Sequence, residues 1–451
     1  MTSSGATSRT DADSEHADLA LLRGSGRTAM VEAALTGSKQ FDPGTDTDLQ
    51  VSVHQVHHRP GAGVSVGYSV SFISRGHRVH DYVVASTSPA ATGGEGVALL
   101  DDGVRQVRMW RRPFDPLLPG LRSASDPEVV SSWLPASGLG SAGAVAIRTV
   151  SYRPTRRAVL RVESAAGTVF VKVLPERKSA DLIARHQLLE SAGVPAPRVL
   201  ATPVPGVCVL SAARGSPLAQ AIAGADTHPG NLPEPAELVR WLDLLPEQTL
   251  TLPRRPSWSD RLDFHTAAAA AALPEQADEV VDLGARLAEA LTVVSEEEEV
   301  PTHGDYYEAN VFTNGGTVSD VIDIDSLGPG RRSDDLATML GHIAVLPDLA
   351  PQVYAHTPEV LQRMRQDFET RVGAHALRVR TAAVVLSLIA GATPDQARAR
   401  LRIATQWAHA SVRTRRGANS NLRELSSASP VPLMHATDDE VIANSLGQKD
   451  G

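Results

Sequence analysis

Three polar residues set around one apolar run constrain the fold of this chain more than any other feature of its sequence. Asp305 precedes Asn310 by five positions, and Asp323 ends the apolar run Val321–Ile322. Phosphoryl transfer uses such a set: one carboxylate orients and deprotonates an acceptor hydroxyl, while an amide and a second carboxylate hold Mg²⁺ between nucleotide phosphates. The amide must follow the first carboxylate on a tight loop, and the second carboxylate must come from a neighbouring strand. The pattern therefore predicts a polar loop that leads into a strand pair.

The wider stretch carries a resemblance to a known family. It reads Thr-His-Gly-Asp at 302–305, then Asn310, then Ile-Asp-Ile-Asp at 322–325. This resembles the catalytic loop and metal-binding strand of the aminoglycoside phosphotransferase and choline kinase-like family, whose loop reads His-Gly-Asp, four variable residues and Asn. That family has a bilobal protein-kinase-like fold and transfers the γ-phosphoryl group of ATP or GTP to a hydroxyl of a small molecule. The resemblance implies that Asp305 is the catalytic base, that Asn310 and Asp323 bind Mg²⁺, and that Asp325 is a further metal or network carboxylate.

Four neighbours of this loop have structural interpretations beside the functional ones. Asp335 resembles the family's aspartate that braces the catalytic loop, and His303 is explained best as a packed histidine beneath it. Tyr306 and Tyr307 follow the predicted base directly. They form either an aromatic wall for the acceptor or packing under the loop.

The upstream chain supplies the parts of a phosphate site. Lys172, one of only four lysines, lies in the middle of an apolar strand predicted at 168–174, and a buried ammonium needs an anion. The resemblance implies that Lys172 meets the α- and β-phosphates; the alternative is an edge strand whose lysine points outward. Arg156 and Arg157 lie in the turn between two predicted strands, where they either contact phosphate or stay solvated.

The residues after the lysine strand predict a hinge and leave one gap. Val209, Leu210 and Ala212 resemble the family's hinge, whose backbone would hydrogen-bond the adenine. The family usually pairs its lysine with a glutamate on the following helix, and neither Asp181, the nearer candidate, nor Glu190 stands clearly at that place. An alternative function follows from this gap: a catalytically silent, pseudokinase-like nucleotide-binding module that acts through a partner.

The pattern of apolar periods predicts an α+β chain, with β-rich segments first and mostly helices after about residue 211. The family resemblance implies a bilobal protein-kinase-like fold with a small β-rich N-lobe and a helical C-lobe, and the strands upstream of it predict an additional β-rich N-terminal domain. We expect a disordered tail at 1–25, a β-rich N-terminal cap domain at 26–140, a kinase-like N-lobe at 141–211, a helical catalytic C-lobe at 212–411 and a flexible C-terminal tail at 412–451.

Strands and connections follow from alternation and from turn residues. The expected strands lie at 51–56, 64–72, 79–84 and 104–110 in the cap and at 145–152, 158–163 and 168–174 in the N-lobe, with an irregular connection at 112–143. His-Arg-Pro at 58–60 and Tyr-Arg-Pro at 152–154 begin similar β-runs, so the cap is a candidate decayed copy of the N-lobe sheet. The cap also resembles, more weakly, that of sugar kinases such as maltokinases. We therefore expect a sugar or amino sugar as acceptor first, and an aminoglycoside or amino alcohol next.

Two further signals lie in the C-lobe. Ser333, Thr357 and Thr393 are predicted N-cap hydroxyls of three helices. The acidic run Glu296–Glu299 either attracts a cationic acceptor or is a solvated helix end.

Composition narrows the partners. Forty-three basic and 52 acidic residues give a net charge of −9, which argues against a dedicated nucleic-acid or anionic-membrane binder because such binders need a basic face. A single cysteine, Cys208, cannot form an internal disulfide, and a cytoplasmic location fits. The expected partners are ATP or GTP, Mg²⁺ and a small hydroxylated acceptor; the sequence does not specify an oligomeric state.

Overall fold

The computed structural model of the chain describes residues 14–15, 17–37, 41–58, 63–91, 93–135, 138 and 143–416. The chain forms two compact units. The first holds the residues up to Ile183 together with Val199–Ala212, and the second holds Ala184–Arg198 and the residues from Ala213 onward. The chain therefore crosses between the units three times, after residues 183, 198 and 212.

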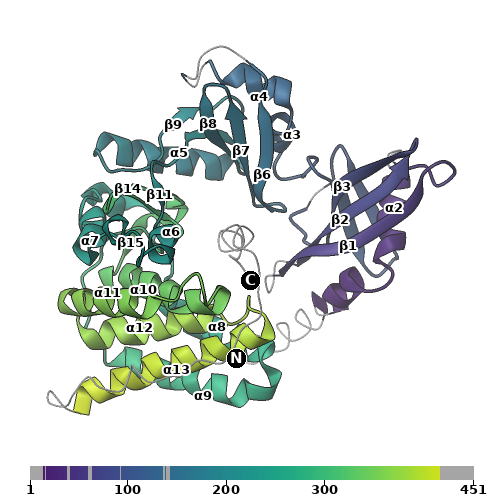
Figure 1. Ribbon diagram of the computed structural model, residues 1–451. Coiled ribbons are helices and arrows are strands. Elements are labelled where there is room, and N and C mark those ends of the chain that lie inside the picture. The colour runs from purple at the N-terminus through teal and green to yellow at the C-terminus, as the bar shows by residue number, and fades with distance from the viewer. Residues whose placement is uncertain are drawn as a thin grey trace. The chain divides into compact units, whose positions relative to one another are not determined.

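The first unit contains sheet A, a five-stranded antiparallel sheet in the order β1-β2-β3-β5-β4 (Figure 1). Its strands are β1 (Thr47–His58), β2 (Val64–Ser74), β3 (His77–Ser86), β4 (Val97–Asp101) and β5 (Gln106–Arg111). One face packs against helix α2 (Arg27–Gly37), where Val31 and Leu35 join Val66 and Tyr68 in a common core. The four predicted strands are confirmed as β1, β2, β3 and β5, whereas β4 and α2 were not predicted.

The expected disordered tail at 1–25 is wrong for residues 17–23, which are helical. Leu22 is fully buried in the core of sheet A, and Leu19 and Leu21 pack against the same core. The Tyr68 hydroxyl donates to the Leu22 carbonyl at 2.7 Å. Because this segment is polar overall, its short apolar stripe gave no prediction of a helix. Residues 1–13 lie outside the described residues.

Sheet B forms the N-lobe and has the order β6-β7-β8-β10-β9. Its strands are β6 (Ala146–Arg153), β7 (Arg157–Ser164), β8 (Gly167–Val173), β9 (Val199–Ala201) and β10 (Val207–Ser211), and helix α5 (Glu176–Ser191) follows β8. Counted along the chain, both sheets have the strand order 1-2-3-5-4. This shared order fits the hypothesis that the cap is a copy of the N-lobe sheet.

The connection at 112–143 is not irregular over its described residues. It contains α3 (Gly120–Ala124) and α4 (Pro127–Trp133), and the Asp126 side chain caps α4. Leu118, Leu121 and Trp133 share one core with residues of sheet B. A Cβ on Gly120 would approach the Val207 side chain to 2.5 Å. The connection therefore packs on sheet B through its apolar side chains.

The second unit is mostly helical. Its helices are α6 (Leu218–Ala223), α7 (Pro235–Asp243), α8 (Leu262–Ala272), α9 (Ala277–Thr292), α10 (Arg332–Leu349), α11 (Thr357–Val372), α12 (Ala374–Ser387) and α13 (Pro394–Arg416). Its short strands are β11 (Ser216–Pro217), β12 (Val300–Thr302), β13 (Val311–Asn314), β14 (Thr317–Val321) and β15 (Gly328–Gly330). Helix α12 packs against α10 and α13 (Figure 1), and its apolar run is buried.

Only one of the three predicted hydroxyl caps forms. At the start of α13 the Thr393 N–H donates to Gln396 Oε1 at 3.2 Å, and the Gln396 N–H donates to the Thr393 hydroxyl oxygen at 3.5 Å, which is a capping box. Helix α10 starts at Arg332, and the Ser333 hydroxyl donates to Glu297 instead (2.7 Å). Thr357 is the first residue of α11 rather than its cap.

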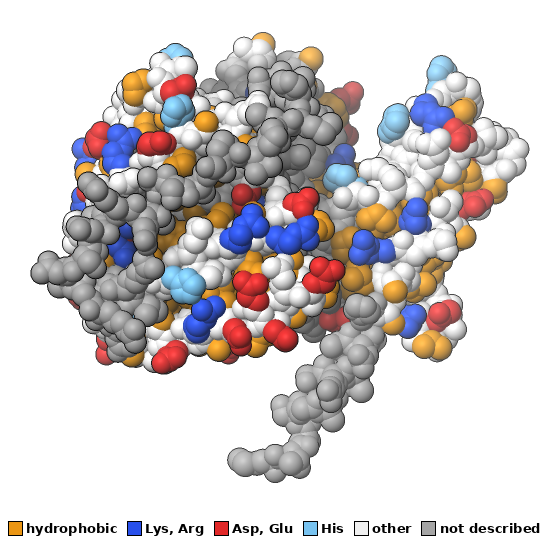
Figure 2. Space-filling view, turned by 60° about the horizontal axis from the view of Figure 1, so that its bottom comes forward, with side chains coloured by type: hydrophobic (Ala, Val, Ile, Leu, Met, Phe, Trp, Pro, Cys, Tyr) orange, Lys and Arg blue, Asp and Glu red, His pale blue; other side chains and the backbone are white. Residues whose placement is uncertain are grey.

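No helix within the described ranges is long and apolar enough to cross a membrane. On the face shown in Figure 2, basic and acidic side chains of the described residues are interspersed. Helix α13 continues to Arg416, so the expected flexible tail at 412–451 begins inside a helix; residues 417–451 lie outside the described residues.

Candidate active site

The loop between β12 and β13 carries the predicted base and the predicted amide ligand. The Asn310 Nδ2 group donates to the Asp305 carbonyl oxygen at 2.9 Å, so the amide oxygen is the part of the side chain left for a cation. Asn310 is buried, and Asp305 is half-buried. The tight loop that the spacing predicts is confirmed.

A hairpin of β13 and β14 brings the second carboxylate to the same place. Val311 pairs with Val321, and the Ile322 N–H donates to the Asn310 carbonyl at 2.9 Å. Asp323 follows directly in a left-handed conformation, with φ of 60°, which is uncommon for a residue other than glycine and concentrates at functional sites. Hydrogen bonds thus join Asp305 to Asn310 and Asn310 to Ile322, the residue before Asp323. Asp325 lies two residues after Asp323, in the short 3₁₀ turn Ile324–Ser326.

His303 holds the loop from beneath. Its ring is fully buried, its Nδ1 accepts from the Asp305 N–H (3.2 Å), and its Nε2 contacts the Ile322 carbonyl at 3.0 Å. Because Nδ1 accepts, the hydrogen bonds require the tautomer in which Nε2 carries the proton and donates. The packed-histidine interpretation is confirmed, and the ring links the base to Ile322, the residue before Asp323.

Asp335 braces the loop as its resemblance implies. One carboxylate oxygen accepts from the His303 N–H and the other from the Gly304 N–H, both at 2.9 Å. Burial raises the pKa of Asp335, while nearby Arg332 and the two N–H groups act in the opposite direction. Gly304 has φ of 76°, and a Cβ there would approach the Ser326 carbonyl to 2.6 Å, so only glycine fits this bend.

Both tyrosines after the base are packing residues. Tyr306 is fully buried, donates to the Leu238 carbonyl at 2.9 Å and stacks on Trp241 with ring centroids 5.8 Å apart. Burial raises its pKa. Tyr307 is also buried and lies against His342. The geometry therefore favours the packing interpretation over the aromatic wall.

Lys172 lies in the interior of sheet B. It pairs in register with Val159 of β7 and Cys208 of β10, and only 6% of it is exposed. The edge-strand alternative is wrong, because β8 has a strand on each side.

Of the three predicted hinge residues, Val209 and Leu210 lie within strand β10 and Ala212 lies just after it. Val209 and Leu210 have partners on both sides, in β8 and β9. Ala212 follows the end of β10 and is the last residue of the first unit before the chain continues at Ala213.

The two predicted phosphate-contacting arginines lie at the β6–β7 turn. Arg156 is exposed and Arg157 is half-buried. The Arg156 N–H donates to the Arg153 carbonyl at 3.0 Å, and Thr155 between them has a positive φ of 64°.

Helix α5 carries three acidic residues, Glu176, Asp181 and Glu190, and all are exposed. Its buried polar residues include Arg185, whose Nε donates to the Leu327 carbonyl at 3.4 Å. The position of the lysine-pairing acid stays open between Asp181 and Glu190.

Comparison with known proteins assigns the chain to a family. A family model described as the Phosphotransferase enzyme family matches residues 140–366, which is 227 of 451 residues. The chain belongs to the phosphotransferase enzyme family. It is therefore a small-molecule phosphotransferase enzyme with the protein-kinase-like combination of a β-sheet N-lobe and a helical C-lobe. The match begins at residue 140, so the resemblance of the cap to that of maltokinases stays a prediction.

The solved structures that resemble this chain include two aminoglycoside phosphotransferases and a choline kinase. A thermostable mutant of aminoglycoside phosphotransferase APH(4)-Ia has 16% identity, covers 61% of this chain and 97% of its own, and gives a TM-score of 0.41. Choline kinase from Cryptosporidium parvum has 12% identity, covers 64% of this chain and 97% of its own, and gives a TM-score of 0.44. Aminoglycoside phosphotransferase APH(3'')-Id from Streptomyces rimosus has 21% identity, covers 57% of this chain and 97% of its own, and gives a TM-score of 0.38. A search of curated proteins gave no match.

The phosphotransferase has an ion pair next to β14, between Arg214 and Asp320, that the sequence interpretation missed. Asp320 of β14 is 2% exposed and accepts from the Arg214 N–H at 2.7 Å and from the Arg214 guanidinium at 2.8 and 3.1 Å. An aspartate at an inward position of an apolar strand was the available signal. The pair anchors the segment after the hinge to the strand that leads to Asp323.

The acidic run of the phosphotransferase is tied into an ion-pair network. Glu297 contacts the buried guanidinium of Arg380 at 3.3 Å, and Glu299 pairs with Arg254 at 2.9 Å. Arg254 in turn pairs with Asp260. Glu297 is half-buried, whereas Glu296, Glu298 and Glu299 are exposed, so the run is partly paired and partly solvated, and it follows the end of α9 at Thr292.

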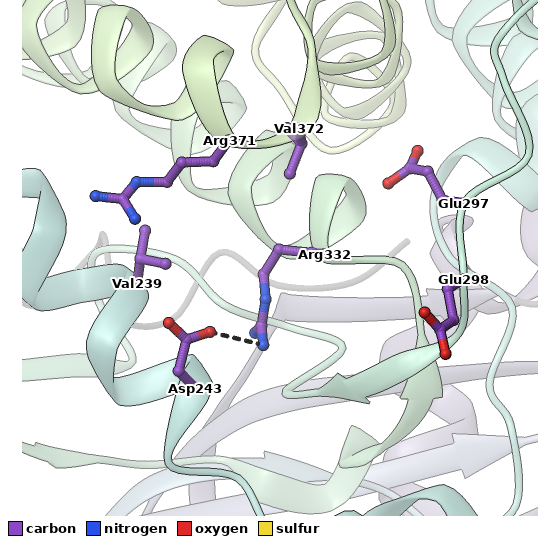
Figure 3. A pocket seen from close by; sticks show the side chains of 7 residues that line it. All are labelled: Val239, Asp243, Glu297, Glu298, Arg332, Arg371 and Val372. Atoms are coloured by element: carbon purple, nitrogen blue, oxygen red, sulfur yellow. Dashed lines mark hydrogen bonds and ion pairs between the residues drawn. The ribbon is translucent and has the colours of Figure 1, made fainter.

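A pocket of about 480 Å³ opens beside this network (Figure 3). Arg332 points toward Asp243 on one side, and Glu298 lies on the other. Arg332 and Asp243 pair at 3.2 Å, and Arg371 pairs with Asp367 at 2.6 Å. The lining thus presents both signs of charge, with its two arginines already in ion pairs.

Proposed function

We propose that this phosphotransferase transfers the γ-phosphoryl group of ATP to a hydroxyl of a small molecule, with Asp305 as the base. One observation carries the proposal: Asp305, Asn310 and the residue before Asp323 are joined by direct hydrogen bonds on one loop and hairpin. The family match supports transfer of a phosphoryl group, and this geometry supplies the groups that such a transfer needs.

Asp305 orients the acceptor hydroxyl and takes its proton late in the transfer. Its backbone is fixed on both sides, by the N–H bond to His303 and by the carbonyl bond to Asn310. A fixed backbone lets the carboxylate hold the hydroxyl in line with the phosphorus, which is where most of the rate acceleration in such reactions arises.

The donor set suits Mg²⁺. Asn310 offers an amide oxygen and Asp323 a carboxylate, with Asp325 as a further carboxylate, and hard oxygen ligands of this kind, completed by water and phosphate oxygens, are what Mg²⁺ prefers. No cluster of three His, Cys, Asp or Glu side chains suited to a metal occurs among the described residues; a site that shares its ion with nucleotide phosphates does not require one. When bound, the ion neutralises charge on the transferring phosphoryl group.

The N-lobe residues are assigned to the nucleotide. Lys172 supplies an ammonium to the α- and β-phosphates, and Arg156 and Arg157 approach the phosphates from the β6–β7 turn. Of the hinge residues, Val209 and Leu210 are in register with strands on both sides, so Ala212 is the one best placed to offer free backbone groups to adenine. GTP is the alternative nucleotide.

The acceptor is a sugar or amino sugar first, and an aminoglycoside or amino alcohol next. Because Glu297 and Glu299 already hold arginines, the acidic run adds little reason to favour a cationic acceptor. The test is consumption of ATP or GTP with Mg²⁺ against a panel of sugars, aminoglycosides and choline-like alcohols, with Asp305→Asn as the matched control. Acceptor-dependent consumption that the control lacks supports the proposal, and a panel with no such acceptor contradicts it.

A catalytically silent nucleotide-binding module is the second candidate, because the sequence does not specify which acid of the following helix pairs with Lys172. It predicts that ATP with Mg²⁺ raises the melting temperature while no acceptor is phosphorylated.

A further inference from the structure

The carboxylate of Asp115, in the connection before α3, joins three segments of the first unit. Asp115 is 3% exposed. Its Oδ1 accepts from the Leu117 N–H at 2.9 Å, and its Oδ2 accepts from the Tyr152 hydroxyl and from the Thr155 N–H, both at 2.7 Å. The Tyr152 hydroxyl in turn accepts from Trp110 Nε1 at 2.9 Å. One buried acid thus connects the last strand of the cap, the connection and the β6–β7 turn.

The turn that Asp115 reaches has an unfavourable backbone. Pro154 and Thr155 are its central residues, and the Arg156 N–H closes it on the Arg153 carbonyl. Proline at the first central position followed by positive φ at the second is the pattern of a type II turn, whose second position normally requires glycine or asparagine. Thr155 adopts φ of 64° although it is β-branched, which is a genuine outlier that persists only when its surroundings enforce it.

Asp115 supplies that enforcement directly. The Thr155 N–H donates to a buried carboxylate, and bonds to an ionised acceptor are about twice as strong as neutral ones. Rotation of Thr155 to an ordinary φ would turn this N–H away and leave it without the carboxylate.

The cap flanks the same turn from another side. Tyr82 of β3 packs edge-on against Tyr152, with ring centroids 5.9 Å apart. Burial and the charges of Arg153 and Arg156 lower the pKa of His57, near the end of β1, to about 4. Residues of the cap and of the connection therefore lie beside Tyr152 and the turn that carries Arg156.

We propose that Asp115 is a positioning residue that holds the Arg153–Arg157 turn in the conformation that receives the nucleotide phosphates, so that the cap and its connection are part of the ATP site. This inference rests on the proposed function, in which Arg156 and Arg157 approach the phosphates. Asp115 itself does not contact the nucleotide; it acts through Thr155.

Affinity for ATP compared with adenosine separates positioning from a merely structural role. We expect Asp115→Ala in the full chain to weaken binding of ATP with Mg²⁺ about tenfold, equivalent to 1.4 kcal/mol, and to leave adenosine within about twofold. Adenosine lacks the phosphates that the turn holds, whereas general loosening of the unit would weaken both ligands. Asp126→Ala is the matched control, because it removes another aspartate of the same connection that caps α4 and does not touch the turn.

A second substitution tests the path through Thr155. Glycine adopts positive φ without strain, so Asp115→Ala combined with Thr155→Gly should bind ATP within about threefold of Thr155→Gly alone. A purely structural loss at Asp115 would not be restored by glycine at another position. Asp115→Asn, which keeps the shape and one acceptor oxygen, repeats the comparison with a smaller loss if the alanine variant does not fold.

Hydrogen exchange separates failure of this inference from failure of the proposed function. Peptides that cover 153–157 should exchange faster in Asp115→Ala than in wild type or in Asp126→Ala, with or without ATP. A wild-type protein that binds no ATP would contradict the proposed function, and the exchange result would still report on the turn. Unchanged exchange, equal loss of ATP and adenosine affinity, or no restoration by glycine would overturn the inference.

Discussion

Replacing Asp335 should destabilise the catalytic loop and slow transfer. Asp335→Ala removes a buried carboxylate that accepts from the His303 and Gly304 N–H groups. Each bond to a charged acceptor contributes roughly 1.5–3 kcal/mol, and removal of the buried charge returns part of its desolvation cost. We therefore expect a net loss of about 2–4 kcal/mol, or roughly 5–10 °C in melting temperature for a unit of this size.

The assay is thermal and urea unfolding of the full chain, with Asp263→Ala as control, since Asp263 is an exposed residue of α8. That control should stay within about 0.5 kcal/mol of wild type. Asp335→Asn keeps one acceptor oxygen and should lie between the two. An Asp335→Ala protein as stable and as active as wild type would show that the loop does not depend on this carboxylate.

Asp260 carries a pH-dependent part of the stability: burial alone would raise its pKa, but the Ser257 N–H with Arg331 and Arg254 lowers it to about 2. The ionised Asp260 carboxylate therefore stabilises the fold above its unfolded pKa near 3.8, and this stabilisation is lost as pH falls through 2. Because Asp260 is exposed and water screens its ion pairs, Asp260→Asn should cost only about 1 kcal/mol at pH 7 and little at pH 2 in urea unfolding. Asp323→Ala should abolish the Mg²⁺-dependent part of the thermal shift given by ATP, whereas Lys172→Ala should weaken the shift and keep its Mg²⁺ dependence; an unchanged Mg²⁺ response in Asp323→Ala would point to Asp325. A chain that starts at Ser141 should be less soluble and melt lower, because it loses Leu118, Leu121 and Trp133 from the core of sheet B; equal yield and melting temperature would contradict this.

The loop and the hairpin were predictable because their signals are local. Asp305, Asn310 and Asp323 lie within 19 positions, and the hydrogen bonds that join them run between residues at most 19 apart. The role of Asp335 came from the family resemblance, since nothing in its own neighbourhood indicates that it reaches back to residue 303.

Other contacts had no signal in the sequence. Asp115 meets Thr155 from 40 positions away, and Arg380 meets Glu297 from 83. Ser333 looked like a helix cap by local rules, but its hydroxyl turns to Glu297 because the ion-pair network lies on that side. Such tertiary partners override local preferences, and one sequence does not encode them as a pattern.

Transfer of the γ-phosphoryl group by Asp305→Asn tests the central claim most directly. The substitution keeps the shape of the side chain but removes its ability to orient the hydroxyl as an anion and to accept its proton. The measurement is single-turnover transfer from labelled ATP to the best acceptor of the panel, beside the dissociation constant for ATP with Mg²⁺. We predict a fall in rate of about 10² or more with nucleotide affinity little changed; a variant that keeps most of the wild-type rate would contradict the assignment of Asp305 as the base.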